Sequence, residues 1–174
     1  MQAYEEHYTI DDYHQWRGDW ELIRGRPYAM TPSPGVTHQR TAGKIFRQLD
    51  EGLDACEHCT ALPEIDWEIA NDTVVRPDVI VACHQTGERI VRTPALVVEV
   101  ISASSARRDE ELKFELYQRE GVPFYLLVYP EKALAKIFRL ADGRFTKLGD
   151  FHTERATLSI EGCDVTLDFA SIWP

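Results

Sequence analysis

The chain has 174 residues, of which 44% are hydrophobic and 28% charged, a composition typical of one globular domain over residues 1–174. Its formal net charge of −10 argues against nonspecific coating of nucleic acid, which depends on clustered lysine and arginine, so any nucleic-acid contact must be local. We expect a cytoplasmic protein with no membrane partner, because no apolar run approaches the roughly 18 residues of a membrane span and the amino terminus lacks the features of a secretory signal.

The first part of the chain predicts two helices separated by a hairpin. A helix is expected to begin at Thr9, ahead of two acidic residues, and to end near Gly18. Residues 20–30 predict a hairpin, and the proline-rich stretch that follows predicts a loop over 31–35. A second helix is predicted over 36–53, where apolar residues recur every three or four positions.

The rest of the chain predicts a β-sheet that is crossed by one helix. Apolar runs predict strands of a central sheet at 65–69, 79–82, 96–101 and 124–129. A helix is expected to begin near Ser104 or Ser105 and to end before Gly121. Two hairpins are predicted over 133–148 and 157–169. The expected fold class is therefore α/β (α+β), with a central mixed β-sheet flanked by helices and with additional β-hairpins.

The four cysteines are expected to be free thiols. Cys56, Cys59, Cys83 and Cys163 are sparse, and intracellular proteins seldom keep disulfides. Cys56, His58 and Cys59 have the first half of a zinc-ligand spacing, but no second pair follows at a comparable spacing. We therefore predict neither a disulfide framework nor a zinc site.

Charged residues lie where an isolated charge is costly. Glu99 lies in a run that is apolar on both faces, and Asp78 opens another predicted strand. Two carboxylates that meet on adjacent strands repel each other, and a divalent cation relieves that repulsion. On the next helix Asp109, Lys113 and Tyr117 are spaced by four residues and share a face. The pattern predicts a metal site at Asp78 and Glu99, with Lys113 within reach.

Each of these charges also has a structural interpretation. Glu99 could pair with Lys113 or Arg92 only to neutralise a buried charge. Asp78 could form a turn at the end of a strand, and Lys113 could form an exposed helix salt bridge with Asp109. The occurrence of all three charges together around buried strands favours the metal site.

Six segments of the chain together resemble the Uma2 family of endonucleases, formerly a domain of unknown function. The family is assigned to the PD-(D/E)XK restriction-endonuclease-like superfamily. The resemblance implies a restriction-endonuclease-like fold and hydrolysis of DNA with Mg²⁺ or Mn²⁺ as the cofactor. The segments are Arg76–Val81, Pro94–Ser102, Asp109–Lys113 with Tyr117, Gly121–Tyr125, Trp20–Gly25, and Met30–Pro34 with His38.

The same resemblance implies roles for individual residues. Asp78 and Glu99 become the catalytic, metal-binding acids. The family motif places a lysine two residues after the second acid, where this chain has Ile101. Lys113, on the neighbouring helix, is expected to replace that lysine as a catalytic residue and to assist the attacking water.

Further side chains are expected to line the site as accessory residues. Glu21 is expected as an accessory acid, and His38 as a lining residue, although a histidine on an apolar helix face can equally be a core residue. The accessory set is Glu21, His38, Asp109 and Tyr117. The main alternatives to a nuclease are a noncatalytic nucleic-acid-binding or regulatory module and an assembly protein with a buried ion network. A homodimer is expected, because enzymes that cut duplex DNA often need two active sites.

Overall fold

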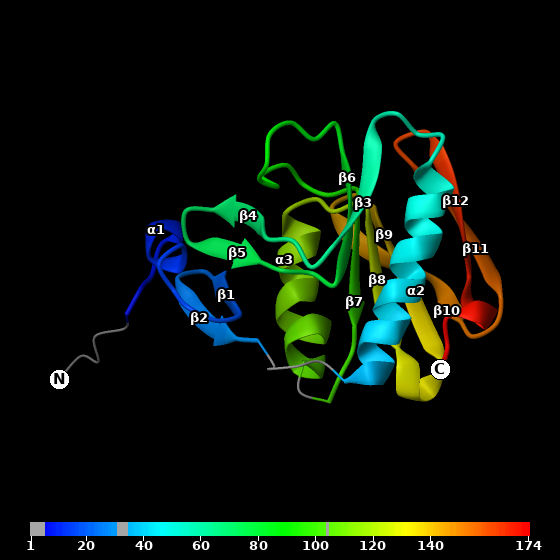
Figure 1. Cartoon of the computed structure of the whole chain (residues 1–174), viewed down its shortest axis with the longest axis horizontal. Coiled ribbons are helices and arrows are strands. Elements are labelled where there is room, and N and C mark those ends of the chain that lie inside the picture. The colour runs from blue at the N-terminus through cyan, green and yellow to red at the C-terminus, as the bar shows by residue number, and fades with distance from the viewer. Residues whose placement is uncertain (1–5, 31–34, 104) are drawn as a thin grey trace.

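The computed structural model describes residues 6–30, 35–103 and 105–174. The described residues form a six-stranded sheet, a four-stranded sheet and a separate two-stranded hairpin, together with the helices shown in Figure 1. The predicted loop over 31–34 and the predicted helix start at Ser104 lie outside the described residues.

The six-stranded sheet is the centre of the fold. Its order is β10-β9-β8-β7-β6-β3, and β7 and β8 form its parallel pair among antiparallel neighbours. Because both faces are covered, its inner strands are continuous apolar runs, as the sequence predicted. The strands are β3 (Cys59–Pro63), β6 (Val79–Cys83), β7 (Leu96–Val100), β8 (Phe124–Tyr129), β9 (Leu134–Ala141) and β10 (Arg144–Phe151).

Different elements cover the two faces of this sheet (Figure 1). One face packs on α2 (Val36–Leu53) and on the hairpin of β11 (Arg155–Ile160) and β12 (Cys163–Asp168). The other packs on α3 (Lys113–Arg119). Successive side chains of a strand alternate between faces, so Glu99 of β7 points to the α3 side.

The four-stranded sheet has the order β2-β1-β5-β4. The hairpin of β1 (Trp20–Ile23) and β2 (Arg26–Ala29) confirms the prediction, and its turn residues Arg24 and Gly25 have positive φ angles of 53° and 75°. The prediction that the strand near 65–69 joins the central sheet is wrong. β4 (Trp67–Ala70) instead turns back to pair with β5 (Thr73–Val75), which pairs with β1.

The helices agree with the sequence in position and differ in detail. The first helix, α1 (Ile10–Tyr13), has the predicted Thr9 cap but ends well before Gly18. α2 has the predicted bounds. The third begins as a π-helical turn, η1 (Arg108–Leu112), and continues as α3. Short 3₁₀ turns follow at η2 (Pro130–Lys132) and η3 (Phe169–Ser171). Within the described ranges, no helix combines the length and apolar character needed to cross a membrane.

The expectation of free thiols is wrong, because Cys56 bonds to Cys163 and Cys59 to Cys83. The β3–β6 register places Cys59 directly opposite Cys83. Cys163 begins β12, which packs against α2, and Cys56 follows the end of that helix. The pairings depend on contacts between residues far apart in sequence, which cysteine spacing alone does not show.

Candidate active site

A cleft of about 310 Å³ is lined mainly by charged side chains from both sheets, α2, η1 and α3. It brings together six of the seven residues that the sequence predicted for the site, all except Tyr117. They are Glu21, His38, Asp78, Glu99, Asp109 and Lys113. Residues from five separate parts of the sequence therefore meet in one cleft.

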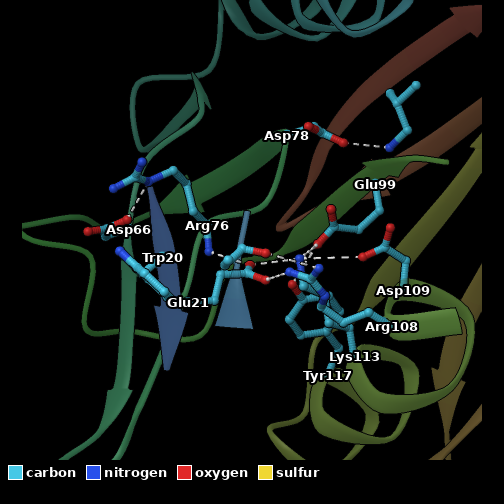
Figure 2. Close-up of polar contacts among 12 residues, drawn as sticks. Trp20, Glu21, Asp66, Arg76, Asp78, Glu99, Arg108, Asp109, Lys113 and Tyr117 are labelled. Atoms are coloured by element: carbon cyan, nitrogen blue, oxygen red, sulfur yellow. Dashed lines mark hydrogen bonds and ion pairs between the residues drawn. The ribbon is translucent and has the colours of Figure 1, made fainter. Parts of the chain in front are cut away.

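Lys113 lies at the centre of the cluster, and three carboxylates converge on it (Figure 2). Its Nζ is 2.7 Å from Glu21 Oε1, 2.9 Å from Glu99 Oε1 and 3.5 Å from Asp109 Oδ1. None of the four residues is more than 3% exposed. The alternative of an exposed salt bridge between Lys113 and Asp109 is therefore wrong, since the pair is buried.

The π-helical turn sets the positions of the helix residues in this cluster. The backbone N–H of Lys113 donates to the carbonyl of Arg108, five residues back, which widens the helix before α3 begins. Asp109 and Lys113 both point inward, and Arg108 Nη1 lies 3.2 Å from Glu21 Oε2. Such turns often occur at functional sites.

Tyrosines complete the buried network. The Tyr117 hydroxyl donates to Glu99 Oε1 at 2.7 Å, and the Tyr125 hydroxyl donates to the Asp109 carbonyl at 2.9 Å. Burial and the nearby Glu99 carboxylate raise the pKa of Tyr117 well above its ordinary value, so its hydroxyl remains a donor. Tyr117 thus contacts Glu99 from behind the site, but it is not among the residues that line the cleft.

The carboxylates outnumber the cations of the cluster. Burial raises the pKa of Glu99 well above its ordinary value, and repulsion from Asp109, Asp78 and Glu21 adds to the effect while Lys113 opposes it. Burial likewise raises the pKa of Asp109. Burial is the main cause of both shifts, and the neighbouring carboxylates add to it, so a nearby cation would favour the charged form of these acids.

Lys113 remains cationic in these surroundings. Burial alone would lower its pKa, but the carboxylates of Glu21, Glu99 and Asp109 outweigh that effect and raise the pKa well above its ordinary value. A lysine in this state donates hydrogen bonds and does not accept a proton. This geometry therefore does not favour Lys113 as a base that removes a proton from the attacking water.

Asp78 lies at the edge of this cluster, beside the end of β7. Its Oδ2 accepts a hydrogen bond of 2.6 Å from the backbone N–H of Val100 and lies 3.4 Å from His38 Nε2. The carboxylate therefore reaches across to the neighbouring strand instead of closing a local turn. Among the described residues, the buried Nδ1 of His38 has no hydrogen-bond partner. His38 is thus a lining residue in contact with an acid, not a satisfied core histidine.

The predicted set of site residues did not include the arginines of the cleft. Arg76 donates its backbone N–H to Glu21 Oε1 at 2.9 Å, while its guanidinium pairs with Asp66 and Asp19 at 2.7 and 2.8 Å. Arg108 also lines the cleft. Their positions in the sequence could have indicated them, because Arg76 lies two residues before Asp78 and Arg108 directly precedes Asp109. Arg92, considered as a partner of Glu99, instead donates to the His84 carbonyl.

The donor set suits a hard divalent cation. Carboxylate oxygens are the ligands that Mg²⁺ and Mn²⁺ prefer. Asp78 and Glu99 line the same cleft, and the Asp78 charge contributes to the raised pKa of Glu99, so the two acids are close enough to interact. These residues could hold such an ion, which would also offset the excess of negative charge.

Comparisons with known proteins concern the family and the fold. The model of the Uma2 family, described as "Putative restriction endonuclease", matches residues 10–169. A solved structure from Anabaena variabilis ATCC 29413, described as "a putative nuclease belonging to DUF820", has a similar fold. It is 13% identical, and the match has a TM-score of 0.76 and covers 95% of this chain and 97% of that one. A comparison with curated proteins found no match.

Proposed function

The chain belongs to the Uma2 family, and we propose that it hydrolyses DNA phosphodiester bonds with Mg²⁺ or Mn²⁺ held by Asp78 and Glu99. The observation that carries the proposal is the excess of carboxylates around Lys113. Glu21, Glu99 and Asp109 surround that one buried ammonium in an open cleft, and Asp78 lies beside them. A structural ion network alone would have no need for this uncompensated charge.

Each proposed ligand is held by the protein through one of its oxygens. Asp78 is held at Oδ2 by Val100 and His38, and Glu99 is held at Oε1 by Lys113 and Tyr117. The other oxygen of each carboxylate is the atom that we propose binds the cation. Hydrogen bonds to one oxygen fix the orientation of a carboxylate before the ion arrives, which strengthens metal binding.

The cation and Lys113 supply different parts of the chemistry. A bound divalent cation polarises the phosphate and lowers the pKa of a coordinated water. Lys113, as a permanent ammonium, orients Glu99 and stabilises the negative charge that develops on the phosphoryl oxygens. We assign to Lys113 the assistance of the attacking water by hydrogen bonding, not the removal of its proton.

The cleft also offers cationic groups to a polyanion, although the whole chain has a net charge of −10. Arg76 and Arg108 both line it, and their guanidinium groups are partly exposed. A DNA backbone would contact the bound cation and the exposed parts of these guanidinium groups, which also pair with carboxylates of the protein. DNA contact that is confined to the cleft agrees with the argument, made from the net charge, against nonspecific coating of nucleic acid.

The test is cleavage of supercoiled, linear and single-stranded DNA with and without Mg²⁺ or Mn²⁺. We expect cleavage that requires the divalent cation and falls at least a hundredfold in Asp78→Asn and in Glu99→Gln. Asp150→Asn on the exposed strand β10 is the matched control and should cleave normally. Metal-dependent cleavage that persists in both site variants would overturn the assignment, and saturable DNA binding without cleavage would favour the noncatalytic module.

We further propose that residues 1–174 form a single domain and that two copies associate. Both main hydrophobic clusters include residues of the six-stranded sheet, which favours one cooperative unit. β10 and β3 are the edge strands of that sheet and could pair with another copy. Light scattering of the purified protein tests the association, and a monomer at all concentrations would contradict it.

A further inference from the structure

All four cysteines meet at the end of the molecule opposite the cleft. α2 carries His38 in its first turn and ends at Leu53, about 22 Å away along the helix, and Cys56 follows three residues later. β6 likewise follows Asp78 and ends at Cys83. The cysteine cluster is therefore distinct from the acidic site, although both are built on the same helix and strand (Figure 1).

The cluster contains more than two separate disulfides. Potential ligand atoms of Cys56, His58 and Cys59 all lie within 4.8 Å of one another. Cys163 Sγ, bonded to Cys56, is 3.9 Å from His58 Nε2. The structure thus supplies the distant ligand that the Cys56–Cys59 spacing lacked in the sequence. Cys83 is the fifth residue of the cluster, to which it is linked by its disulfide bond to Cys59.

The His58 ring makes a hydrogen bond that is common among metal-binding histidines. Its Nε2 lies 3.0 Å from the Glu161 carbonyl, and since a carbonyl only accepts, Nε2 must carry the proton. Nδ1 then has a free lone pair, and Cys56 Sγ is about equally far from the two ring nitrogens, 4.0 Å from Nδ1 and 3.9 Å from Nε2. A ligating histidine commonly donates its other ring N–H to a backbone carbonyl. The ring also stacks on His84, with centroids 4.8 Å apart, which limits its rotation.

We propose that the reduced protein binds one Zn²⁺ through Cys56, His58 Nδ1, Cys59 and Cys163. A tetrahedral site with Zn–S of about 2.3 Å and Zn–N of about 2.0 Å spaces its ligands about 3.5–3.8 Å apart. The ligand atoms of Cys56, His58 and Cys59 lie within 4.8 Å of one another, so they must close in by up to about 1 Å, whereas the bonded sulfurs of Cys56 and Cys163 must move apart. Thiolate and imidazole ligands select Zn²⁺ over the hard cations that suit the acidic cleft.

The cysteine ligands become available when thiol–disulfide exchange reduces both disulfides. A dithiol reductant gives two electrons and two protons to each disulfide, which becomes two thiols, and the dithiol itself is oxidised to a disulfide. Zn²⁺ then displaces the thiol protons of Cys56, Cys59 and Cys163. Cys83 remains a free thiol beside the site. The metal would replace the covalent links between the end of α2, β3 and β12.

The experiment titrates the full chain with Co²⁺, whose tetrahedral thiolate complexes give visible and charge-transfer bands that carboxylate sites do not. The reduced protein, freed of reductant without air, should saturate at one Co²⁺ per chain, and Zn²⁺ should abolish the bands. The oxidised protein should show none. This comparison needs no substitution, so a failure of a variant to fold does not affect it.

Variants then test the ligand set. In the reduced protein, Cys163→Ser and His58→Ala should weaken Co²⁺ binding at least tenfold. Cys83→Ser is the matched control, because it also removes a cysteine and breaks a disulfide but keeps all four ligands, and it should retain the bands. Bands in the oxidised protein, their absence after reduction, or their loss in Cys83→Ser with retention in Cys163→Ser would overturn the proposal. Disulfides that stay closed in excess dithiol, counted by thiol titration, would overturn it equally.

Discussion

Lys113 is the residue on which the charge balance of the cleft depends. It is buried, and it pairs with carboxylates that come from β1, β7 and η1. Removing one member of a buried ion network is costly because the remaining charges lose their partner in a place that water hardly reaches. Lys113 therefore holds three elements together as well as serving the proposed chemistry.

We predict that Lys113→Met lowers the free energy of unfolding by about 3–5 kcal/mol, because Glu21, Glu99 and Asp109 lose their shared partner. Denaturant unfolding measures the change. Lys147→Met, at a side chain that is 47% exposed, is the control and should stay within about 0.5 kcal/mol. Equal effects of the two substitutions would show that the buried ammonium has no special role in stability.

Glu99 should make stability depend on pH in a particular direction. Because burial raises its pKa above the ordinary value of 4.5, the folded state holds the proton more tightly than the unfolded state. The contribution of this group to stability is full below pH 4.5 and is lost as pH rises through the folded pKa. Glu99→Gln mimics the protonated acid, so in metal-free buffer its stability relative to the unchanged protein should rise with pH. A difference that is constant or falls with pH would contradict this.

The sequence alone predicted the acidic residues of the cleft but not its arginines. Glu99 and Asp78 are visible because they interrupt apolar runs, where a charge is costly, and Lys113 because helical spacing placed it toward those runs. Arg76 and Arg108 gave no such signal, since arginine in a turn is usually solvated. Arg107, next to Arg108, is indeed 92% exposed. Arg108 instead begins the π-helical turn and lines the cleft. No residue pattern predicted that turn.

At the scale of elements, α2 carries two glycines whose surroundings differ. A Cβ at Gly43 would meet no atom within 4 Å, whereas one at Gly52 would come 2.7 Å from Cγ1 of Val165 on β12. Val165 is fully buried and β-branched, so it has little freedom to move. Helix propensity and packing therefore oppose each other at one position and not at the other.

We predict that Gly43→Ala raises the free energy of unfolding by about 1 kcal/mol, because alanine favours the helix. Gly52→Ala should lower it by about 1–3 kcal/mol, because the added methyl overpacks the contact between α2 and β12. Thermal or denaturant unfolding of the two variants measures both signs. Stabilisation of similar size by both substitutions would mean that α2 does not approach β12 this closely.

Local sequence patterns predicted the helices and hairpins more reliably than they predicted which sheet a strand joins. α2 and the hairpin turns are set by spacing and turn residues along the chain, and their predicted positions are confirmed. The assignment of β4 to the central sheet failed because an apolar run does not say which sheet buries it. β3 (Cys59–Pro63) was not predicted, since its residues alternate only briefly and it ends in proline.

At the scale of the molecule, the disulfides link elements that are distant in sequence. Cys56–Cys163 spans a separation of 107 residues and Cys59–Cys83 one of 24. A longer closed loop restricts the unfolded chain more, by about 5 kcal/mol for the first and about 3.5 kcal/mol for the second on the chain-entropy model. The long link therefore contributes more to stability on this account.

We predict that replacing Cys56 and Cys163 by serine destabilises the oxidised protein more than replacing Cys59 and Cys83. Chemical denaturation of the two double variants in zinc-free buffer gives the difference, expected at about 1 kcal/mol or more. An equal loss in both, or a larger loss for the short link, would show that strain or residual structure outweighs loop length.

The central claim is that Asp78 and Glu99 bind a divalent cation, and thermal unfolding of the oxidised protein during a Mn²⁺ titration tests it most directly. A ligand that binds only the folded state raises the unfolding temperature as its concentration increases. The account predicts a saturable rise at neutral pH that is lost in Asp78→Asn and Glu99→Gln and kept in Asp150→Asn. A rise of the same size in all four proteins, or no rise in the unchanged protein, would contradict it.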